Sequence, residues 1–212
     1  MENRFDIIIF DWSGTISDDR LPVYEANKRI LKSYGINLNS FDKWLKTTNG
    51  SIISYCKSLG IEEDKEIIFN SYKEAYNQVV EEGIAPNHYA DAVLVLSHLR
   101  KKDKTLAIVS SHPQFNLEEE VAGYGMQELF KIIKGNSLDK SFDINQIIER
   151  NSCMPERTVY IGDMIQDIEA ASKSGIPCAV VTTGYHSKER LEKANPSLGV
   201  FDNLVELSKI LV

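Results

Sequence analysis

Short, uninterrupted apolar runs recur along the chain and predict the strands of a buried sheet. The runs are Ile7–Phe10, Leu106–Val109, Thr158–Ile161 and Cys178–Val181. A run without polar alternation is typical of a strand that is covered on both faces. Helical periodicity predicts helices around these runs, at Tyr89–Lys101, Phe115–Tyr124, Phe142–Asn151, Gln166–Ser174 and Ser187–Lys193. Strands that alternate with helices through short connections predict an α/β fold, a Rossmann-like parallel sheet with helices on both faces.

Between about Pro22 and Gly83 the pattern is helical throughout. It predicts four helices: Pro22–Tyr34, Ser40–Lys46, Ser51–Leu59 and Asp64–Glu82. Three of them end next to a glycine, where helices commonly stop: Gly35, Gly60 or Gly83. We therefore expect an all-helical cap domain inserted after the first strand. Residues 1–18 and 86–212 form the expected core and residues 19–85 the expected cap.

The composition limits the classes of partner. The chain has 212 residues and a net charge of -7, with acidic triplets at Glu62–Asp64 and Glu118–Glu120 that we expect to be solvated helix faces. No basic run is interleaved with aromatic residues, so nucleic-acid binding is not expected, and no apolar stretch has the length of a membrane span. Three widely spaced cysteines fit neither a zinc site nor a disulfide framework. We expect a cytoplasmic protein, as a monomer or homodimer, that binds a small molecule.

Asp11 directly follows the first apolar run and opens the sequence Asp-Trp-Ser-Gly-Thr. Open α/β sheets bind their ligands at the carboxyl ends of the strands, so this carboxylate lies where chemistry is expected. Taken alone it has three interpretations: a nucleophile, a metal ligand, or the cap of the turn that follows.

A second candidate site follows the strand that ends at Val109, in the sequence Ser110-Ser111-His112-Pro113. Pro113 fits the first position of the next helix, so hydroxyls and backbone N–H groups meet at a helix N-terminus. Such a terminus binds anions such as phosphate. The alternative is that Ser111 only caps the helix.

A third candidate site follows the strand that ends at Ile161. Asp163 and Asp167 lie four residues apart, where the strand gives way to a helix, and can face the same point. Carboxylates with room for water suit a hard cation, above all Mg²⁺. The alternative is a helix N-cap at Asp163, with Asp167 as an acid of the first turn.

The three sites, in this order and with a lysine between the second and third, resemble the motifs of the haloacid dehalogenase-like superfamily. The motifs are Asp-x-x-Gly-Thr, a serine at a strand end, a lysine and Gly-Asp-x-x-x-Asp. The likeness covers nearly the whole chain, and the helical insertion resembles the first-position cap of that superfamily. The chain is similar to the branch that holds phosphoglycolate phosphatases, β-phosphoglucomutases and phosphonoacetaldehyde hydrolases.

The resemblance implies a hydrolase that acts on a small phosphorylated substrate. Asp11 resembles the nucleophile that takes the phosphoryl group as an aspartyl-phosphate. Ser110, joined by Ser111, resembles the group that holds the phosphoryl oxygens. Lys140 lies at the distance from the third motif that members commonly show, and we prefer it to Lys134 as the lysine that offsets the negative charge.

The resemblance also implies a Mg²⁺ cofactor. Asp163 resembles a metal ligand, and Asp11 and the backbone carbonyl of Ser13 are expected to join it. Asp167 is expected to support the metal or its waters.

Ser13 departs from the family pattern, because phosphatases of the family usually carry a second aspartate there as the proton donor and acceptor. A serine hydroxyl cannot serve as a proton reservoir near neutral pH, and general acid–base catalysis is worth about 10²–10⁴-fold. One consequence is a substrate whose leaving group departs without a proton: an acyl phosphate, a phosphoramidate, a pyrophosphate or an acidic aryl phosphate. Alternatively Asp18, Asp19, His112 or a cap residue replaces the acid, or the aspartyl-phosphate persists and the protein is a slow hydrolase or a phosphate-binding regulator.

Trp12 adds a further alternative, since phosphonoacetaldehyde hydrolases resemble Asp-Trp-Ala-Gly-Thr at this motif. They cleave a carbon–phosphorus bond through a Schiff base on a cap lysine. The cap has several lysines that could serve, including Lys28, Lys43, Lys46 and Lys57. The segment Thr47–Ser51 falls between two predicted cap helices and is either a loop that closes over the site or an ordinary helix–helix turn.

Overall fold

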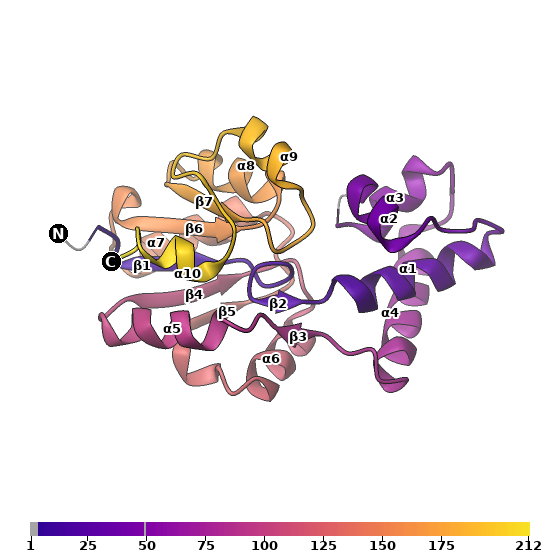
Figure 1. Cartoon of the computed structure of the whole chain (residues 1–212), viewed down its shortest axis with the longest axis horizontal. Helices are drawn as coiled ribbons and strands as arrows, with labels where there is room; N and C mark the ends of the chain where they lie inside the picture. The colour runs from indigo at the N-terminus through magenta and orange to yellow at the C-terminus, as the bar shows by residue number, and fades with distance from the viewer. Residues whose placement is uncertain (1–3, 49) are drawn as a thin grey trace. The chain divides into compact units, whose positions relative to one another are not determined.

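The computed structural model describes residues 4–48 and 50–212, which form two compact units (Figure 1). The larger unit contains the chain up to Ser17 together with His88–Val212, and the smaller is Asp18–Asn87. The chain passes between them through β2 (Ser17–Asp18) and β3 (Asn87–His88), which pair with each other. The helical insertion therefore follows the first strand of the larger unit.

A six-stranded parallel sheet forms the centre of the larger unit, in the order β5-β4-β1-β6-β7-β8. Its strands are β1 (Ile7–Phe10), β4 (Thr105–Val109), β5 (Ile132–Lys134), β6 (Thr158–Gly162), β7 (Cys178–Val181) and β8 (Val200–Phe201). Phe10, the last residue of β1, lies opposite Ile108 of β4 and Ile161 of β6. Because neighbouring parallel strands end at the same edge, this register brings the residues that follow β1, β4 and β6 together.

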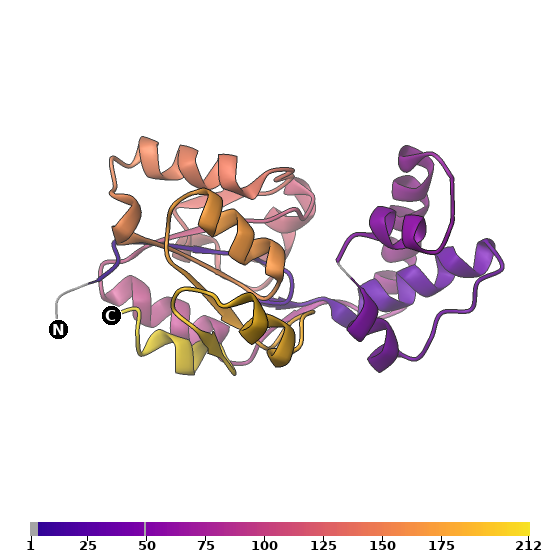
Figure 2. The same cartoon turned by 90° about the horizontal axis from the view of Figure 1, so that it is seen from above.

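The period of two in a strand explains why the sheet is covered on both faces. Ile8 and Phe10 pack against α5 (Ala92–Lys101), α6 (Gln114–Gly123) and α10 (Leu204–Ser208), whereas Ile7 and Ile9 face α7 (Lys140–Arg150), α8 (Ile165–Lys173) and α9 (Lys188–Ala194). Figure 2 shows these two helical layers on either side of the sheet. Two 3₁₀ helices, η1 (Gln127–Leu129) and η2 (Pro155–Arg157), lie in the connections. The predicted α/β core is confirmed.

The smaller unit is all-helical, as predicted, apart from the ends of β2 and β3. It contains α1 (Arg20–Ser33), α2 (Phe41–Thr47), α3 (Ile52–Ser58) and α4 (Lys65–Glu81). Apolar residues of α1 and α4 meet in its core, including Ala26, Ile30 and Ala75. Ser51 caps α3, because its side chain accepts the backbone N–H of Ser54. This contact agrees with the prediction of an ordinary helix–helix turn at that residue. The rest of the Thr47–Ser51 hypothesis involves Asn49, which lies outside the described residues.

Across residues 4–48 and 50–212 no helix has both the length and the apolarity needed to cross a membrane.

Candidate active site

Asp11 lies at the end of β1 with its carboxylate held from two sides. The side chain is 7% exposed. Its Oδ1 accepts the backbone N–H of Trp12 at 2.7 Å, and its Oδ2 lies 2.9 Å from Lys140 Nζ. The backbone N–H of Asp11 continues the sheet by donating to Ile161. The carboxylate is therefore oriented by the strand and by one largely buried cation.

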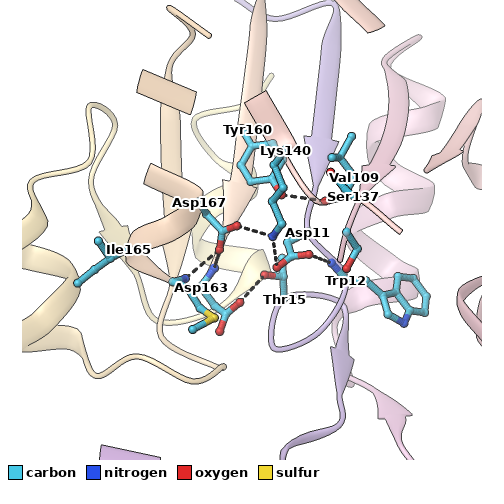
Figure 3. Close-up of polar contacts among 12 residues, drawn as sticks. Asp11, Trp12, Thr15, Val109, Ser137, Lys140, Tyr160, Asp163, Ile165 and Asp167 are labelled. Atoms are coloured by element: carbon cyan, nitrogen blue, oxygen red, sulfur yellow. Dashed lines mark hydrogen bonds and ion pairs between the residues drawn. The ribbon is translucent and has the colours of Figure 1, made fainter. Parts of the chain in front are cut away.

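Lys140 joins the end of β1 to the first turn of α8 through a largely buried ion-pair network (Figure 3). Its Nζ lies 2.7 Å from Asp167 Oδ1 as well as 2.9 Å from Asp11 Oδ2. It is the first residue of α7, not a residue before it as the sequence suggested, and Asp139 caps this helix. Lys134, the alternative lysine, pairs with Asp143 at 3.7 Å. The structure thus brings Lys140 to the carboxylates.

Asp163 is fully buried beside the turn that follows Asp11. It accepts the hydroxyl of Thr15 at 3.3 Å and the backbone N–H of Tyr185 at 2.7 Å. Met164, not Asp163, is the N-cap of α8. The helix-cap interpretation of Asp163 is therefore wrong, and its carboxylate lies in the cluster.

Asp167 contacts both the backbone at the start of α8 and the Lys140 ammonium of the carboxylate cluster. Its Oδ2 accepts the backbone N–H groups of Asp163 and Met164 at 3.1 and 3.0 Å, while its Oδ1 faces Lys140. Hydrogen bonds of this kind fix the carboxylate at the helix N-terminus, where the dipole favours negative charge.

The cluster carries more negative than positive charge. Asp11, Asp163 and Asp167 each offer a carboxylate oxygen, and these three atoms lie within 4.8 Å of one another. Burial, together with the neighbouring carboxylates, raises the pKa of Asp11 and raises that of Asp163 well above its ordinary value. Burial lowers the pKa of Lys140, but the Asp11 and Asp167 carboxylates outweigh this effect and hold it well above the usual range. A set of hard oxygen donors with uncompensated charge fits a divalent cation such as Mg²⁺.

Two glycines let the chain approach the carboxylates closely. Gly14 has φ +77°, and a Cβ there would lie 2.4 Å from Asp163 Oδ2. A Cβ on Gly184 would lie 2.0 Å from the same oxygen. Ser13 is half-buried in the turn before Gly14, and the Gly14 N–H donates to the Ser17 carbonyl at 2.7 Å. The turn is therefore packed directly against the acidic cluster.

The loop after β4 places its two serines differently. Ser110 is buried and its Oγ accepts the backbone N–H of His112 at 3.3 Å, whereas Ser111 is exposed. Pro113 is the N-cap of α6, so Ser111 does not cap that helix and Pro113 is not its first residue. Ser110 follows β4, the strand next to β1, and so lies at the same edge of the sheet as Asp11.

Glu120 is a functional candidate that the sequence did not reveal. We expected it on a solvated helix face, but only 14% of its side chain is exposed. Its Oε2 accepts the indole N–H of Trp12 at 2.7 Å and the hydroxyl of Ser17 at 3.4 Å, and its Oε1 lies 3.1 Å from His112 Nε2. Trp12 itself is fully buried, stacks on Tyr124, and points away from the carboxylate cluster (Figure 3).

With this fold and acidic cluster, the chain belongs to the haloacid dehalogenase-like hydrolase family, whose pattern it matches over residues 8–181. It is thus a hydrolase of that family, as the motifs predicted.

Relatives and solved structures agree with this assignment. The chain is 30% identical over 104 residues to a phosphoglycolate phosphatase of Synechococcus elongatus, a match that covers 48% of this chain and 49% of that protein. The matched part thus spans about half the length of that relative. The chain is also 26% identical over 204 residues to a 5′-nucleotidase of Pseudomonas aeruginosa, covering 92% of this chain and 90% of that one. Its fold matches the crystal structure of a predicted phosphoglycolate phosphatase from Haemophilus somnus 129pt, with a TM-score of 0.82 and 21% identity over 100% of both chains.

Proposed function

We propose that this protein is a Mg²⁺-dependent phosphohydrolase of a small phosphorylated metabolite and that it works through an aspartyl-phosphate on Asp11. The observation that carries the proposal is the position of Lys140 between Asp11 and Asp167, 2.9 and 2.7 Å away. A largely buried cation shared by a strand-end carboxylate and a second acid suits a site where further negative charge arrives.

In the proposed phosphoryl transfer each residue of the site has its own role. Trp12 N–H and Lys140 orient the Asp11 carboxylate, whose oxygen attacks phosphorus while the bond from phosphorus to the leaving group breaks. Ser110 and Lys140 hold the phosphoryl oxygens, and the exposed Ser111 adds a hydroxyl at the rim of the loop. Water then attacks the aspartyl-phosphate, and the Asp11 carboxylate is restored.

The carboxylates of Asp11, Asp163 and Asp167, with the backbone carbonyl of Ser13, are the groups that would hold Mg²⁺. When bound, Mg²⁺ neutralises charge on the phosphoryl oxygens and on the carboxylates. Thr15 and Tyr185 orient Asp163 for this task.

Ser13 favours substrates with good leaving groups, because its hydroxyl cannot supply a proton. Acyl phosphates, phosphoramidates, pyrophosphates and acidic aryl phosphates form this class. The carbon–phosphorus alternative needs a neutral cap lysine, a state that burial favours. All lysines of the cap are exposed, so we rank that reaction below phosphate-ester and phosphoanhydride hydrolysis: Lys28, Lys32, Lys43, Lys46, Lys57, Lys65 and Lys73.

The names of the relatives support a phosphorylated metabolite as substrate, since phosphoglycolate phosphatase and 5′-nucleotidase both name phosphate esters of small molecules. The three cysteines, Cys56, Cys153 and Cys178, are free thiols, which fits action in the reducing cytoplasm.

A leaving-group series tests the proposal. Phosphate release is measured with Mg²⁺ on acetyl phosphate, a phosphoramidate, p-nitrophenyl phosphate and a simple alkyl phosphate. We expect a steep fall toward the alkyl ester and loss of all activity in Asp11→Asn. Asp103→Asn is the matched control, because Asp103 is exposed in the turn before β4 and has φ 58°, a conformation that asparagine tolerates. Equal rates on all four substrates would contradict the leaving-group preference, and an active Asp11→Asn variant would contradict the mechanism.

A further inference from the structure

Tyr160 is a fully buried polar residue that has no role in the phosphoryl transfer described above. It is the third residue of β6, and none of its surface is exposed. The residues at the same level on the neighbouring strands are apolar or small: Ile9, Ala107 and Cys178. Phenylalanine would fill this position without burying a hydroxyl, whose loss of hydration is offset only by a hydrogen bond. The contacts of the Tyr160 hydroxyl and ring therefore indicate what a tyrosine provides here.

The hydroxyl of Tyr160 reaches across β1 to the end of β4. It donates to the carbonyl of Val109 at 2.9 Å, and β1 lies between β6 and β4 in the sheet. The carbonyl of Val109 and the N–H of Ser110 belong to one planar peptide group, and this N–H donates to the Lys134 carbonyl at 2.9 Å. The peptide that leads into Ser110 is therefore held on both sides. Burial raises the pKa of Tyr160 well above its ordinary value, so the hydroxyl remains a donor near neutral pH.

The ring of Tyr160 contacts the Lys140 ammonium. Lys140 Nζ lies over the ring, 5.8 Å from its centroid (Figure 3). An aromatic face attracts a cation within about 6 Å of its centroid, most strongly where water is excluded. Asp11 and Asp167 hold the same ammonium, but the Asp11 carboxylate is consumed when it takes the phosphoryl group. The ring has no part in that reaction, so its contact with Lys140 persists.

We propose that Tyr160 is a positioning residue for the phosphoryl group and acts through Ser110 and Lys140; this inference rests on the proposed function. The hydroxyl fixes the peptide from which Ser110 leaves the sheet. The ring supports the Lys140 ammonium before and after Asp11 is phosphorylated. One side chain of β6 thus aligns the two groups that hold the phosphoryl oxygens, one directly after β4 and one at the start of α7.

Tyr160→Phe tests the hydroxyl, because it removes that group and keeps the ring. Steady-state rates are measured with p-nitrophenyl phosphate and Mg²⁺, and inorganic phosphate is the competitive probe of the phosphoryl site. We expect the KM and the inhibition constant of phosphate to rise about 5–10-fold, the effect of one lost hydrogen bond, with kcat within about threefold of wild type. A lowered Tm with an unchanged inhibition constant would show a structural role alone and overturn the proposal.

Tyr24→Phe is the matched control, because Tyr24 makes the same two kinds of contact in the smaller unit. Its largely buried side chain donates to the Asn39 carbonyl at 2.9 Å, and Lys28 Nζ lies 5.7 Å from its ring centroid. The inhibition constant of phosphate should change in Tyr160→Phe and not in Tyr24→Phe. A change of the same size in both variants would show a general effect of a lost hydroxyl and overturn the proposal.

Pentafluorophenylalanine, incorporated at position 160, tests the ring. Fluorination nearly preserves the size of a phenylalanine ring but withdraws electrons from its face, so the attraction to a cation is lost. We expect kcat to fall about fivefold or more relative to Tyr160→Phe, because Lys140 is held less firmly. An equal kcat in the two proteins overturns the role of the ring.

Phosphorylation of Asp11 during turnover separates failure of the proposed function from failure of this inference. A wild-type protein that turns over substrate without phosphate on Asp11 contradicts the proposed function and this inference with it. Phosphate on Asp11 in both the wild type and Tyr160→Phe, with equal inhibition constants for inorganic phosphate, overturns the role of Tyr160 alone.

Discussion

Replacing Lys140 by methionine should destabilise the Mg²⁺-free protein strongly. Methionine keeps much of the length of the side chain but removes the charge between Asp11 and Asp167. With an effective dielectric constant of ~20, each contact contributes about 6 kcal/mol of Coulomb attraction before the cost of burying the charges is subtracted. Loss of one partner from a buried ion pair typically costs about 3–5 kcal/mol. Because Lys140 serves two carboxylates, we expect a loss near the upper end of that range at pH 8.

The loss should shrink as the pH falls. The folded-state pKa of Asp11 and Asp163 is raised above the ordinary value, so their stabilising contribution is complete below about pH 4 and is lost as the pH rises through the raised values. Without Lys140 these carboxyls titrate at still higher pH. The difference in free energy of unfolding between wild type and variant should therefore be larger at pH 8 than at pH 5.

Urea denaturation at pH 5 and pH 8, without Mg²⁺, measures this difference. Lys134→Met is the control, because Lys134 is 43% exposed and its carboxylate partner lies 3.7 Å away; exposed pairs are worth about 0–1 kcal/mol. A Lys140→Met variant that loses no more stability than Lys134→Met, or whose loss does not depend on pH, would refute the reasoning.

Three further changes probe the acidic cluster and its turn. Asp163→Asn should raise the Tm of the Mg²⁺-free protein near neutral pH, because it removes a charge that burial disfavours. It should also abolish the rise in Tm that Mg²⁺ produces in the wild type. A lowered Tm with an intact Mg²⁺ response would contradict this prediction. Gly14→Ala should lower the free energy of unfolding, measured by urea denaturation, by more than about 2 kcal/mol. Gly35→Ala is the control, because Gly35 has a similar φ of +74° but nothing lies within 4 Å of a new Cβ. This control should lose about 1 kcal/mol. Equal losses in the two variants would show that contact with Asp163 is unimportant. Ser13→Asp should raise kcat for an alkyl phosphate about 10-fold or more relative to acetyl phosphate, and an unchanged ratio of the two would argue against a missing proton donor.

The core of the fold could be predicted because its strands are buried on both faces. β1, β4, β6 and β7 lie in the middle of the sheet, where uninterrupted apolar runs are needed. β5 and β8 are the edge strands and have only three and two residues, so neither has enough length for a pattern to show. Their existence depends on pairing with a neighbour and not on their own sequence.

Some charged residues of the site could likewise be located from the sequence, and others only from the structure. Asp11 and Asp163 could be located because each directly follows, or nearly follows, a buried strand. The sequence ranked Lys140 above Lys134 by spacing alone, and only the packing of α7 shows which of the two reaches the carboxylates. Glu120 could not be distinguished from its exposed neighbours, because its main contact is with Trp12, 108 residues earlier in the chain.

The covalent state of Asp11 during turnover tests the central claim most directly. The protein is mixed with acetyl phosphate and Mg²⁺, quenched in acid within the first turnovers, and the phosphorylated peptide is identified by mass spectrometry. We predict one phosphoryl group, carried by Asp11 and absent from Asp11→Asn. Phosphate on Ser13 or Ser110, or turnover with no covalent phosphate on Asp11, would contradict the account.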